Sequence, residues 1–419
     1  MPLSVRFCIL AFMKRCPYRR IILATLLWLI LPSPGPAVSR AQEQYVVVNI
    51  IPGEAYPPIF EEIAQLKKRR TSAHVALGIG AIFSYLNSSR EQIRNDLNEF
   101  LSLSEMHDIP VIVQLDGEQW WGARPDLWNW WEPGRPGYDT SNRNNVEWFG
   151  WGPEYAMKIA WRNWGRQIRV LPPPNMMSPL YRTACHDEMR LLIPLVLQWW
   201  NQLPEGKKHL LIGIKLGWES AIGVNSFYLP DGNALLPSPE EKDSLVELRG
   251  ELVPDRGVAA IGYAAVSTAR LAGGGALREE DLAEIVTRHL EDLCGLAAEL
   301  GVPRGRLFTH VGGWKEEELL YNAALNKYSC PGWSFYRHAS DPSKDKGVMR
   351  VLQKNDAPYW AAAEWLLMGE HDAEAWRAAL THTLAIPQCR YVCIYNWSGI
   401  RTSGSAVDAI LSITDDRAH

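Results

Sequence analysis

Short apolar segments alternate with amphipathic segments along most of this 419-residue chain, and this alternation constrains the fold more than any other feature. Runs rich in β-branched and apolar residues at positions 45–51, 74–79 and 109–115 have the length of buried strands. Segments with helical periodicity separate such runs, and the chain holds eight strand-plus-helix units. Because strands that alternate with helices form parallel sheets, the sequence predicts an α/β fold, a closed (β/α)8 TIM barrel.

The other five strands of the predicted barrel follow the same criteria. They are expected at residues 210–216, 306–310, 329–336, 358–363 and 390–395. Helices are expected where apolar residues recur at helical spacing, at residues 57–70, 88–107, 179–201, 281–300, 316–325, 344–353, 373–385 and 406–412. The expected organisation is therefore a single barrel domain over residues 42–419.

The segment before this domain has the pattern of a targeting sequence. Basic residues at positions 14–20 precede an apolar run at 21–31 that is too short to span a bilayer comfortably. Residues 39–41, Ser-Arg-Ala, form an acceptable cleavage site. We therefore expect a cleaved signal peptide over residues 1–41 and a secreted or periplasmic protein without further membrane contact. An uncleaved membrane anchor is the alternative.

Two stretches, residues 119–177 and 225–275, are too long for ordinary connections between a strand and a helix. Both follow the carboxyl ends of strands, so both are expected as insertions over the mouth of the barrel. The first insertion is rich in tryptophan, and of the 19 in the chain it contains Trp120, Trp121, Trp128, Trp130, Trp131, Trp148, Trp151, Trp161 and Trp164. Because aromatic rings stack on the apolar faces of sugars, we expect this insertion to line a saccharide cleft. A small packed core of its own is the alternative.

Charge and cysteine content argue against several classes of function. The formal net charge is −4, which gives no reason to expect a nucleic acid partner. Beyond the targeting segment the cysteines are Cys185, Cys294, Cys330, Cys389 and Cys393, an odd number without the spacing of metal ligands. We expect buried thiols with at most one or two disulfides, and neither a metal nor another cofactor.

The stretch at residues 209–220 provides the starting point for a functional site. Residues 210–216 are mostly apolar, as in a strand buried on both faces, although Lys215 interrupts the run near its end. Trp218 and Glu219 follow almost directly. A carboxylate at the carboxyl end of a barrel strand, beside an indole, lies where barrel enzymes place their catalytic groups.

Other strand ends supply polar side chains to the same mouth. They are Asp116 and Glu118 after the third strand, His310 after the fifth, Glu364 after the seventh, and Asn396 with Trp397 after the eighth. Carboxylates dominate, and the H-x-H and H-E-x-x-H spacings of metal sites do not occur. Two glutamates across a cleft suit glycoside hydrolysis, in which one carboxyl donates a proton and the other is ionised. We therefore predict Glu219 and Glu364 as the catalytic pair.

Glutamates at the ends of strands four and seven resemble the arrangement in the 4/7 superfamily, clan A, of (β/α)8 glycoside hydrolases. The resemblance covers the barrel from about residue 45 to the C-terminus. It implies that Glu219 is the acid/base and Glu364 the nucleophile of a retaining enzyme. Trp397 resembles the aromatic platform that many members place after strand eight.

The sequence departs from the pattern of that clan at two points. Many members have Asn directly before the acid/base, where this chain has Trp218, and residues 74–85 lack the Arg often found near strand two. Asn225 is a candidate for the missing amide. The contact with the sugar 2-hydroxyl and the retaining outcome depend on these positions.

A set of polar and aromatic side chains around the barrel mouth is expected to contact the substrate. It comprises Asp116, Glu118, Trp120, Trp121, Trp218, Asn225, His310, Trp314, Trp333, Asn396 and Trp397. An alternative catalytic pair combines Asp116 or Glu118 with Glu219 and leaves Glu364 structural. For His310, a buried histidine satisfied by a neighbouring group is as good an interpretation as a substrate contact.

The sequence thus predicts a secreted glycoside hydrolase that acts on an oligo- or polysaccharide. A catalytically silent carbohydrate-binding barrel is a second interpretation, since fold alone does not fix function. A third is another enzyme on the same barrel, such as a polysaccharide lyase or an esterase. For a lyase, neither Tyr263 nor Arg124 is placed convincingly as the base or the group that neutralises a uronate.

Overall fold

The computed structural model describes residues 44–67, 75–158, 160–163, 167–223, 260–312 and 319–414. The expected signal peptide lies outside these ranges, as do two of the expected substrate contacts, Asn225 and Trp314. Within the described ranges, no helix is both long and apolar enough to cross a membrane. All the elements below belong to one compact unit, Glu43–His419.

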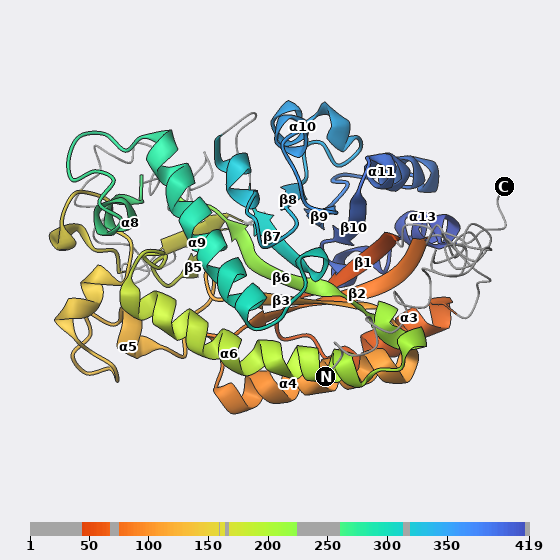
Figure 1. Ribbon diagram of the computed structural model, residues 1–419, viewed down its shortest axis with the longest axis horizontal. Helices are drawn as coiled ribbons and strands as arrows, with labels where there is room; N and C mark the ends of the chain where they lie inside the picture. Colours follow the sequence, from red (N-terminus) through yellow and green to blue (C-terminus); the bar gives the residue numbers. More distant parts are fainter. Residues whose placement is uncertain are drawn as a thin grey trace, which may run out of the picture. The chain divides into compact units, whose positions relative to one another are not determined.

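Eight parallel strands form a closed barrel, which confirms the predicted (β/α)8 fold (Figure 1). In chain order they are β1 (Gln44–Ile50), β2 (Val75–Ser84), β3 (Val111–Asp116), β6 (Leu211–Ser220), β7 (Leu307–Val311), β8 (Gly332–Phe335), β9 (Trp360–Trp365) and β10 (Cys389–Ile394). The barrel closes where β1 pairs with β10, with Tyr45 opposite Tyr391. Along the barrel, β6 is therefore the fourth strand and β9 the seventh.

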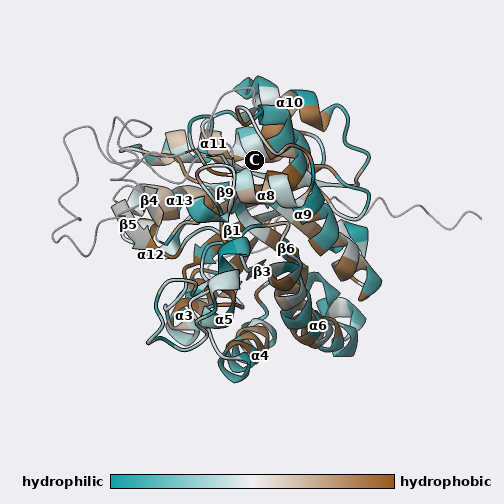
Figure 2. Cartoon of the chain, turned by 90° about the vertical axis from the view of Figure 1, so that its left-hand side faces the viewer, coloured by the Kyte–Doolittle hydropathy of each residue, from teal (hydrophilic) through white to brown (hydrophobic). Residues whose placement is uncertain are grey.

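The helices around the barrel lie close to their predicted positions. They include α3 (Tyr56–Lys67), α4 (Arg90–His107), α6 (Pro179–Gln202), α9 (Glu279–Glu299), α10 (Lys346–Leu352), α11 (Ala373–Ala385) and α13 (Gly404–Ile413). Side chains cap their first turns, as Ser89 does by accepting a hydrogen bond from the Gln92 amide. In Figure 1, α4 and α6 run side by side below the strands, and Figure 2 shows hydrophobic and hydrophilic sides on both helices.

The sixth barrel strand is shorter than the sequence predicts. Cys330 makes only an isolated bridge with Phe308, and β8 begins after Pro331. Proline has no N–H to donate, so it interrupts the ladder at this point. The helix expected at residues 316–325 is also different, because its described part is a 3₁₀-helix, η7 (Leu319–Ala324).

The described part of the first insertion folds into a small satellite on the barrel. It contains α5 (Pro125–Trp128), the 3₁₀-helices η1 (Thr140–Asn144) and η2 (Pro153–Tyr155), and an antiparallel hairpin of β4 (Ala160–Asn163) and β5 (Gln167–Val170). The second insertion contributes α8 (Tyr263–Thr268). The two insertions are joined by buried Glu147, whose carboxyl group accepts hydrogen bonds from the amides of Gly262, Ala264 and Ala265.

The described tryptophan rings of the first insertion pack against other parts of the protein. Five indole N–H groups donate to backbone carbonyls: Trp121 to Pro172, Trp128 to Trp121, Trp130 to Met157, Trp148 to Arg143 and Trp151 to Gly275. Trp121, Trp128 and Trp148 are buried. Rings also contact one another, as in the edge-on pair of Trp130 and Trp131 with centroids 6.0 Å apart. Trp121, Trp128 and Trp148 belong to the main hydrophobic core, and Trp130, Trp131 and Trp151 pack against it, so the structure favours packed indoles over an aromatic cleft wall.

The barrel interior changes from apolar to polar along its axis. Its lower part is a cluster of buried residues that includes Val47, Ile112, Phe308 and Tyr391. Further along the strands lie four buried polar side chains, Asn49, Gln114, Lys215 and His310. The polar layer precedes the carboxyl ends of the strands, where barrel enzymes build their sites.

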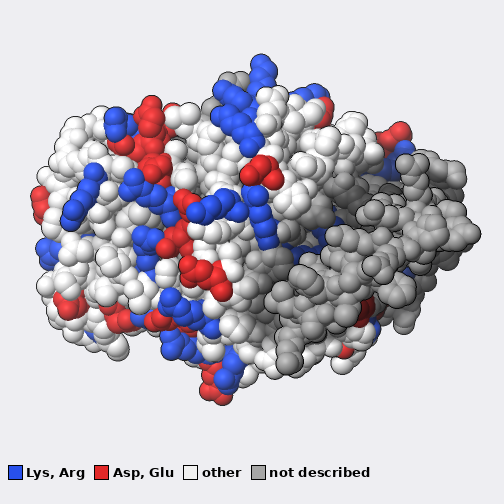
Figure 3. Space-filling view, in the orientation of Figure 1, with Lys and Arg blue, Asp and Glu red and all other residues white. Residues whose placement is uncertain are grey.

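Neither charged side chains on the drawn face nor possible metal ligands among the described residues gather in one place. On the face drawn in Figure 3, basic and acidic side chains are interspersed. Local ion pairs such as Arg288–Glu284 occur on α9. Cys185, Cys294, Cys330, Cys389 and Cys393 are buried free thiols, as the sequence predicts. No group of three or more His, Cys, Asp or Glu side chains in the described ranges could hold a metal ion.

Candidate active site

Glu219 occupies a distorted end of β6. The pairing of β6 with β7 loses its regular register between Leu216 and Ser220, and Gly217 and Glu219 have φ angles of 80° and 50°. A glycine suits the first of these positions, whereas a left-handed conformation at Glu219 costs about 1–3 kcal/mol. Such strain is typical of functional sites. The distortion displaces the Glu219 side chain from the regular alternation of the strand.

Glu364 lies within β9 and is only 3 % exposed. Its Oε2 accepts a hydrogen bond of 3.2 Å from the indole Nε1 of Trp218, and its Oε1 accepts one from the hydroxyl of Tyr336. Burial raises the pKa of Glu364, while the charge of Lys215 and the two hydrogen bonds oppose that rise. These groups therefore favour the ionised form of a carboxyl that burial would otherwise protonate.

The two glutamates lie on parallel strands whose carboxyl ends meet at the same end of the barrel. Trp218, the neighbour of Glu219, donates to Glu364. Ser334, which is paired with Glu364 across β8 and β9, donates from its hydroxyl to Glu219 Oε1 at 2.8 Å. The negative charges of both carboxyls contribute to raising the pKa of Tyr336. Each glutamate is thus held by a residue adjacent to the other.

His310 is a buried histidine whose ring nitrogens both have partners inside the protein. Its Nδ1 lies 2.9 Å from Lys215 Nζ and 3.2 Å from the backbone nitrogen of Glu219. Its Nε2 lies 2.9 Å from Ser334 Oγ. Burial, followed by the charge of Lys215, lowers the pKa of His310 well below its ordinary value. Of the two interpretations of His310, the structure supports the satisfied histidine over the substrate contact.

Asp116 and Glu118 are directed into the protein. The Oδ1 atom of Asp116 accepts from the amides of Glu118 and Gln119, and Oδ2 accepts from Ser84. Burial, with the charge of Glu118, raises the Asp116 pKa to about 7. Glu118 contacts the Ser220 hydroxyl at 2.7 Å and His289 of α9 at 3.0 Å. These contacts favour structural roles for both residues and leave Glu219 paired with Glu364.

Three of the tryptophans expected to contact substrate are instead part of the core. Trp121, Trp333 and Trp397 are each at most 1 % exposed. Their indole nitrogens donate to the Pro172 carbonyl, the Tyr321 carbonyl and the Glu62 carboxylate, respectively. A buried ring offers no face to a sugar, so the expected substrate contacts of these residues are wrong. Trp120 is half-buried and packs against the satellite core.

Tyr395 and Asn396, the two residues before Trp397, are half-buried and border a pocket, whereas Trp397 is buried. The chain turns into α12 (Trp397–Ile400) directly after β10, and this turn directs Trp397 toward Glu62 of α3. Tyr395 is half-buried, and the charges of Glu364 and Glu219 contribute to raising its pKa. Asn396 caps α12, with Oδ1 accepting from the Gly399 amide at 2.8 Å. Tyr395 thus takes the position beside the carboxyls that the resemblance assigns to Trp397.

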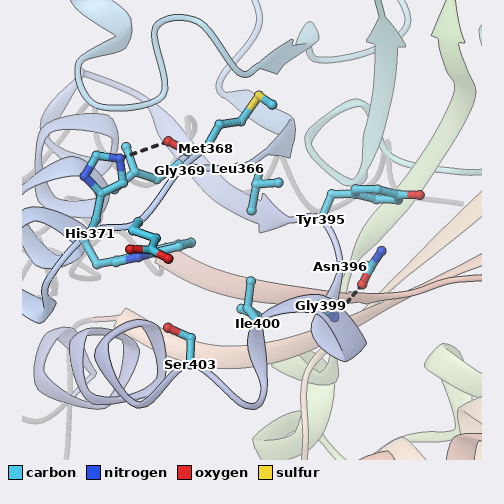
Figure 4. A pocket seen from close by; sticks show the side chains of 12 residues that line it. Leu366, Met368, Gly369, His371, Tyr395, Asn396, Gly399, Ile400 and Ser403 are labelled. Atoms are coloured by element: carbon cyan, nitrogen blue, oxygen red, sulfur yellow. Dashed lines mark hydrogen bonds between the residues drawn. The ribbon is translucent and has the colours of Figure 1, made fainter. Parts of the chain in front are cut away.

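Tyr395 and Asn396 also border a pocket of about 430 Å³ between the loop after β9 and the start of α12 (Figure 4). Its apolar walls include Leu366, Trp376 and Ile400, and its polar groups include Glu370, His371, Asn396 and Ser403. Met368 is on its rim and is 63 % exposed. The volume and the mixture of apolar walls with a few polar groups are typical of small-molecule sites.

Neither a protein-family model nor a curated protein sequence matches this chain. Among solved structures, it is similar to a broad-specificity endoglucanase from an uncultured bacterium, with 7 % identity over 89 % of this chain and 95 % of that chain, and a TM-score of 0.43. A β-amylase catalytic domain from Paenibacillus polymyxa has 8 % identity, coverage of 90 % and 99 %, and a TM-score of 0.48. A β-galactosidase from Marinomonas ef1 has 10 % identity over 88 % of this chain and 59 % of that chain, and a TM-score of 0.47.

Three residues of the site were not among the predicted ones. Ser334 lies on the sixth strand and Tyr336 follows it, where the sequence interpretation named only Trp333, and Tyr395 follows the eighth strand. The rule that located Glu219 and Glu364, polar residues at strand ends, also applies to these positions. The sequence shows Lys215 as the one charged residue of an apolar strand. Its partner His310 could not be predicted, because the contact depends on how neighbouring strands pair.

Proposed function

We propose that this protein is a glycoside hydrolase in which Glu219 is the acid/base and Glu364 the nucleophile. One observation carries the proposal: buried glutamates from the fourth and seventh barrel strands lie at the same end of the barrel and have different hydrogen-bond partners. Two carboxyls in different environments are what glycosidic bond cleavage requires, because one must be protonated while the other is ionised.

The surroundings of each carboxyl support its role. Glu364 has hydrogen-bond donors on both oxygens and the charge of Lys215 nearby, which favour the carboxylate needed for attack on the anomeric carbon. Glu219 would give its proton to the glycosidic oxygen as the carbon–oxygen bond breaks. The resulting glycosyl ester on Glu364 would then be hydrolysed by water, with Glu219 accepting the proton.

The pocket beside Tyr395 supports an oligosaccharide as the substrate. A sugar unit has apolar faces and a rim of hydroxyls, which match the apolar walls and the polar groups of this pocket. Tyr395 borders this pocket and its pKa is raised by burial and then by the charges of Glu364 and Glu219, so we propose that a sugar bound in the pocket is a neighbour of the one being cleaved. We further propose that the protein is secreted or periplasmic, which the mass of the mature N-terminus in an extracellular fraction would test.

A screen of aryl glycosides and oligosaccharides with the purified protein tests the proposed activity. Glu364→Ala is expected to abolish turnover of every substrate, whereas Glu219→Ala is expected to retain activity on dinitrophenyl glycosides, whose leaving group needs no proton. The exposed Glu105→Gln on α4 is the matched control and should behave as the wild type.

External azide identifies the roles directly. We expect azide to rescue Glu219→Ala with a retained glycosyl azide and Glu364→Ala with an inverted one, as in a retaining enzyme with carboxyls about 5–5.5 Å apart. The opposite pattern would exchange the roles. Saccharide binding without any turnover by the wild type would instead indicate a silent carbohydrate-binding barrel.

A further inference from the structure

Two buried side chains, Lys215 and His310, and the half-buried Ser334 come from adjacent strands and form a continuous chain of hydrogen bonds that ends on Glu219. Lys215 Nζ of β6 lies 2.9 Å from His310 Nδ1 of β7, and His310 Nε2 lies 2.9 Å from Ser334 Oγ of β8. The Ser334 hydroxyl lies 2.8 Å from Glu219 Oε1. Lys215 also donates to the Ala363 carbonyl at 3.3 Å, which fixes the start of the chain.

The direction of these hydrogen bonds follows from the donors at His310. The backbone N–H of Glu219 points at His310 Nδ1, and an amide can only donate, so Nδ1 must carry a lone pair. Lys215 donates to the same nitrogen. A neutral imidazole with an unprotonated Nδ1 carries its proton on Nε2. The burial of His310 and the adjacent charge of Lys215, which lower its pKa, agree with a neutral ring.

The remaining steps leave a single arrangement at Glu219. His310 Nε2–H donates to Ser334 Oγ, so the one hydroxyl proton of Ser334 is available for Glu219 Oε1. We propose that Lys215, His310 and Ser334 are positioning residues that make Oε1 of Glu219 an acceptor and so place its transferable proton on Oε2. This inference rests on the proposed role of Glu219 as the acid.

Several titratable groups lie around Glu219 and the residues hydrogen-bonded to it. Those that face it are Glu364 on β9, Tyr336 after β8, Tyr395 after β10 and Asp116 on β3, together with Lys215 and His310. The hydroxyl of Ser334 supplies a hydrogen to Glu219 Oε1, and a single substitution can remove or restore this hydroxyl.

Ser334→Ala and Ser334→Thr form the test pair, because only threonine keeps the hydroxyl. In Ser334→Ala we expect kcat/KM for a glycoside with a poor leaving group to fall about tenfold or more, as general acid catalysis weakens. The dinitrophenyl glycoside should change little. Loss of a hydrogen bond to the carboxylate raises the pKa of Glu219, so the basic limb of the pH profile should move up by about one unit. Ser334→Thr should restore both.

A merely structural Ser334 would reduce activity on both leaving groups equally and leave the basic limb in place, and that result would overturn the inference. Nitrogen-15 NMR of the histidines gives a readout independent of activity, with His310→Gln assigning the signal. We expect a neutral His310 with its proton on Nε2 from pH 5 to pH 8. A proton on Nδ1, or an imidazolium, would also overturn the inference. No turnover by the wild type would refute the proposed function instead, with the NMR result unchanged.

Discussion

Tyr336→Phe removes one hydroxyl and nothing else, and so isolates the effect of a hydrogen bond on the proposed nucleophile. The hydroxyl donates to Oε1 of Glu364, a carboxyl that is only 3 % exposed. A hydrogen bond to a charged group contributes about 1.5–3 kcal/mol, and about 1.4 kcal/mol corresponds to one pKa unit. Because the hydroxyl stabilises the carboxylate more than the acid, its loss should raise the pKa of Glu364.

The expected kinetic result is a shift of the acid limb of kcat/KM. That limb reports the ionisation of the nucleophile in the free enzyme, so it should move up by about one to two pH units in Tyr336→Phe. The basic limb should stay within a few tenths of a unit. Tyr138→Phe, which changes an exposed tyrosine in the first insertion, is the matched control.

Stability should depend on pH in a way that has the same origin. Burial raises the pKa of Glu364 in the folded state above its unfolded value, so the folded protein loses stability as pH rises above about 4. The variant raises the folded pKa further and should lose about 1.5–3 kcal/mol more than the wild type at pH 8, but little at pH 4. Urea unfolding at the two pH values measures this difference. The reasoning would be refuted if the free energies of unfolding of variant and wild type differed equally at pH 4 and pH 8 and the acid limb did not move.

Two further predictions concern the satellite and the pocket. Trp121→Ala should lower the free energy of unfolding, measured by urea denaturation, by about 3–5 kcal/mol, because the indole is buried and hydrogen-bonded. A loss under about 1 kcal/mol would contradict its assignment to the core. Met368→Ala should weaken kcat/KM for oligosaccharides by about fivefold, from about 1 kcal/mol of lost apolar contact, and leave aryl monosaccharides unaffected. Met106→Ala, exposed on α4, is its control, and equal effects of both variants would exclude the pocket from binding.

The order of strands and helices could be predicted because it depends on local periodicity. Each apolar run is long enough to be read without knowing its neighbours, and Ser89 begins α4 by satisfying amides of the same helix. The pairing of Glu219 with Glu364 also follows, since parallel strands present their carboxyl ends at one mouth. Strand count along the chain was therefore enough to bring these two residues together.

The assignment of Trp397 failed because alternation stops where a strand stops. Beyond β10 the chain enters α12, and a side chain one residue farther along is turned toward α3 rather than into the cleft. The prediction that Trp121 contacts substrate was wrong for a related reason. The tryptophan density of the first insertion is compatible with a sugar platform or with a packed core, and only the contacts with carbonyls such as Pro172 and Met157 decide between them.

The sequence by itself determined the barrel and the strand ends that carry the two glutamates, because both depend on periodicity within single segments. Only the tertiary structure decided how Lys215, His310 and Ser334 connect to Glu219. Their contacts require the relative register of β6, β7 and β8, which includes irregular pairing between β6 and β7. Register is a property of pairs of strands, so no pattern within one strand could specify which polar groups would meet inside the barrel.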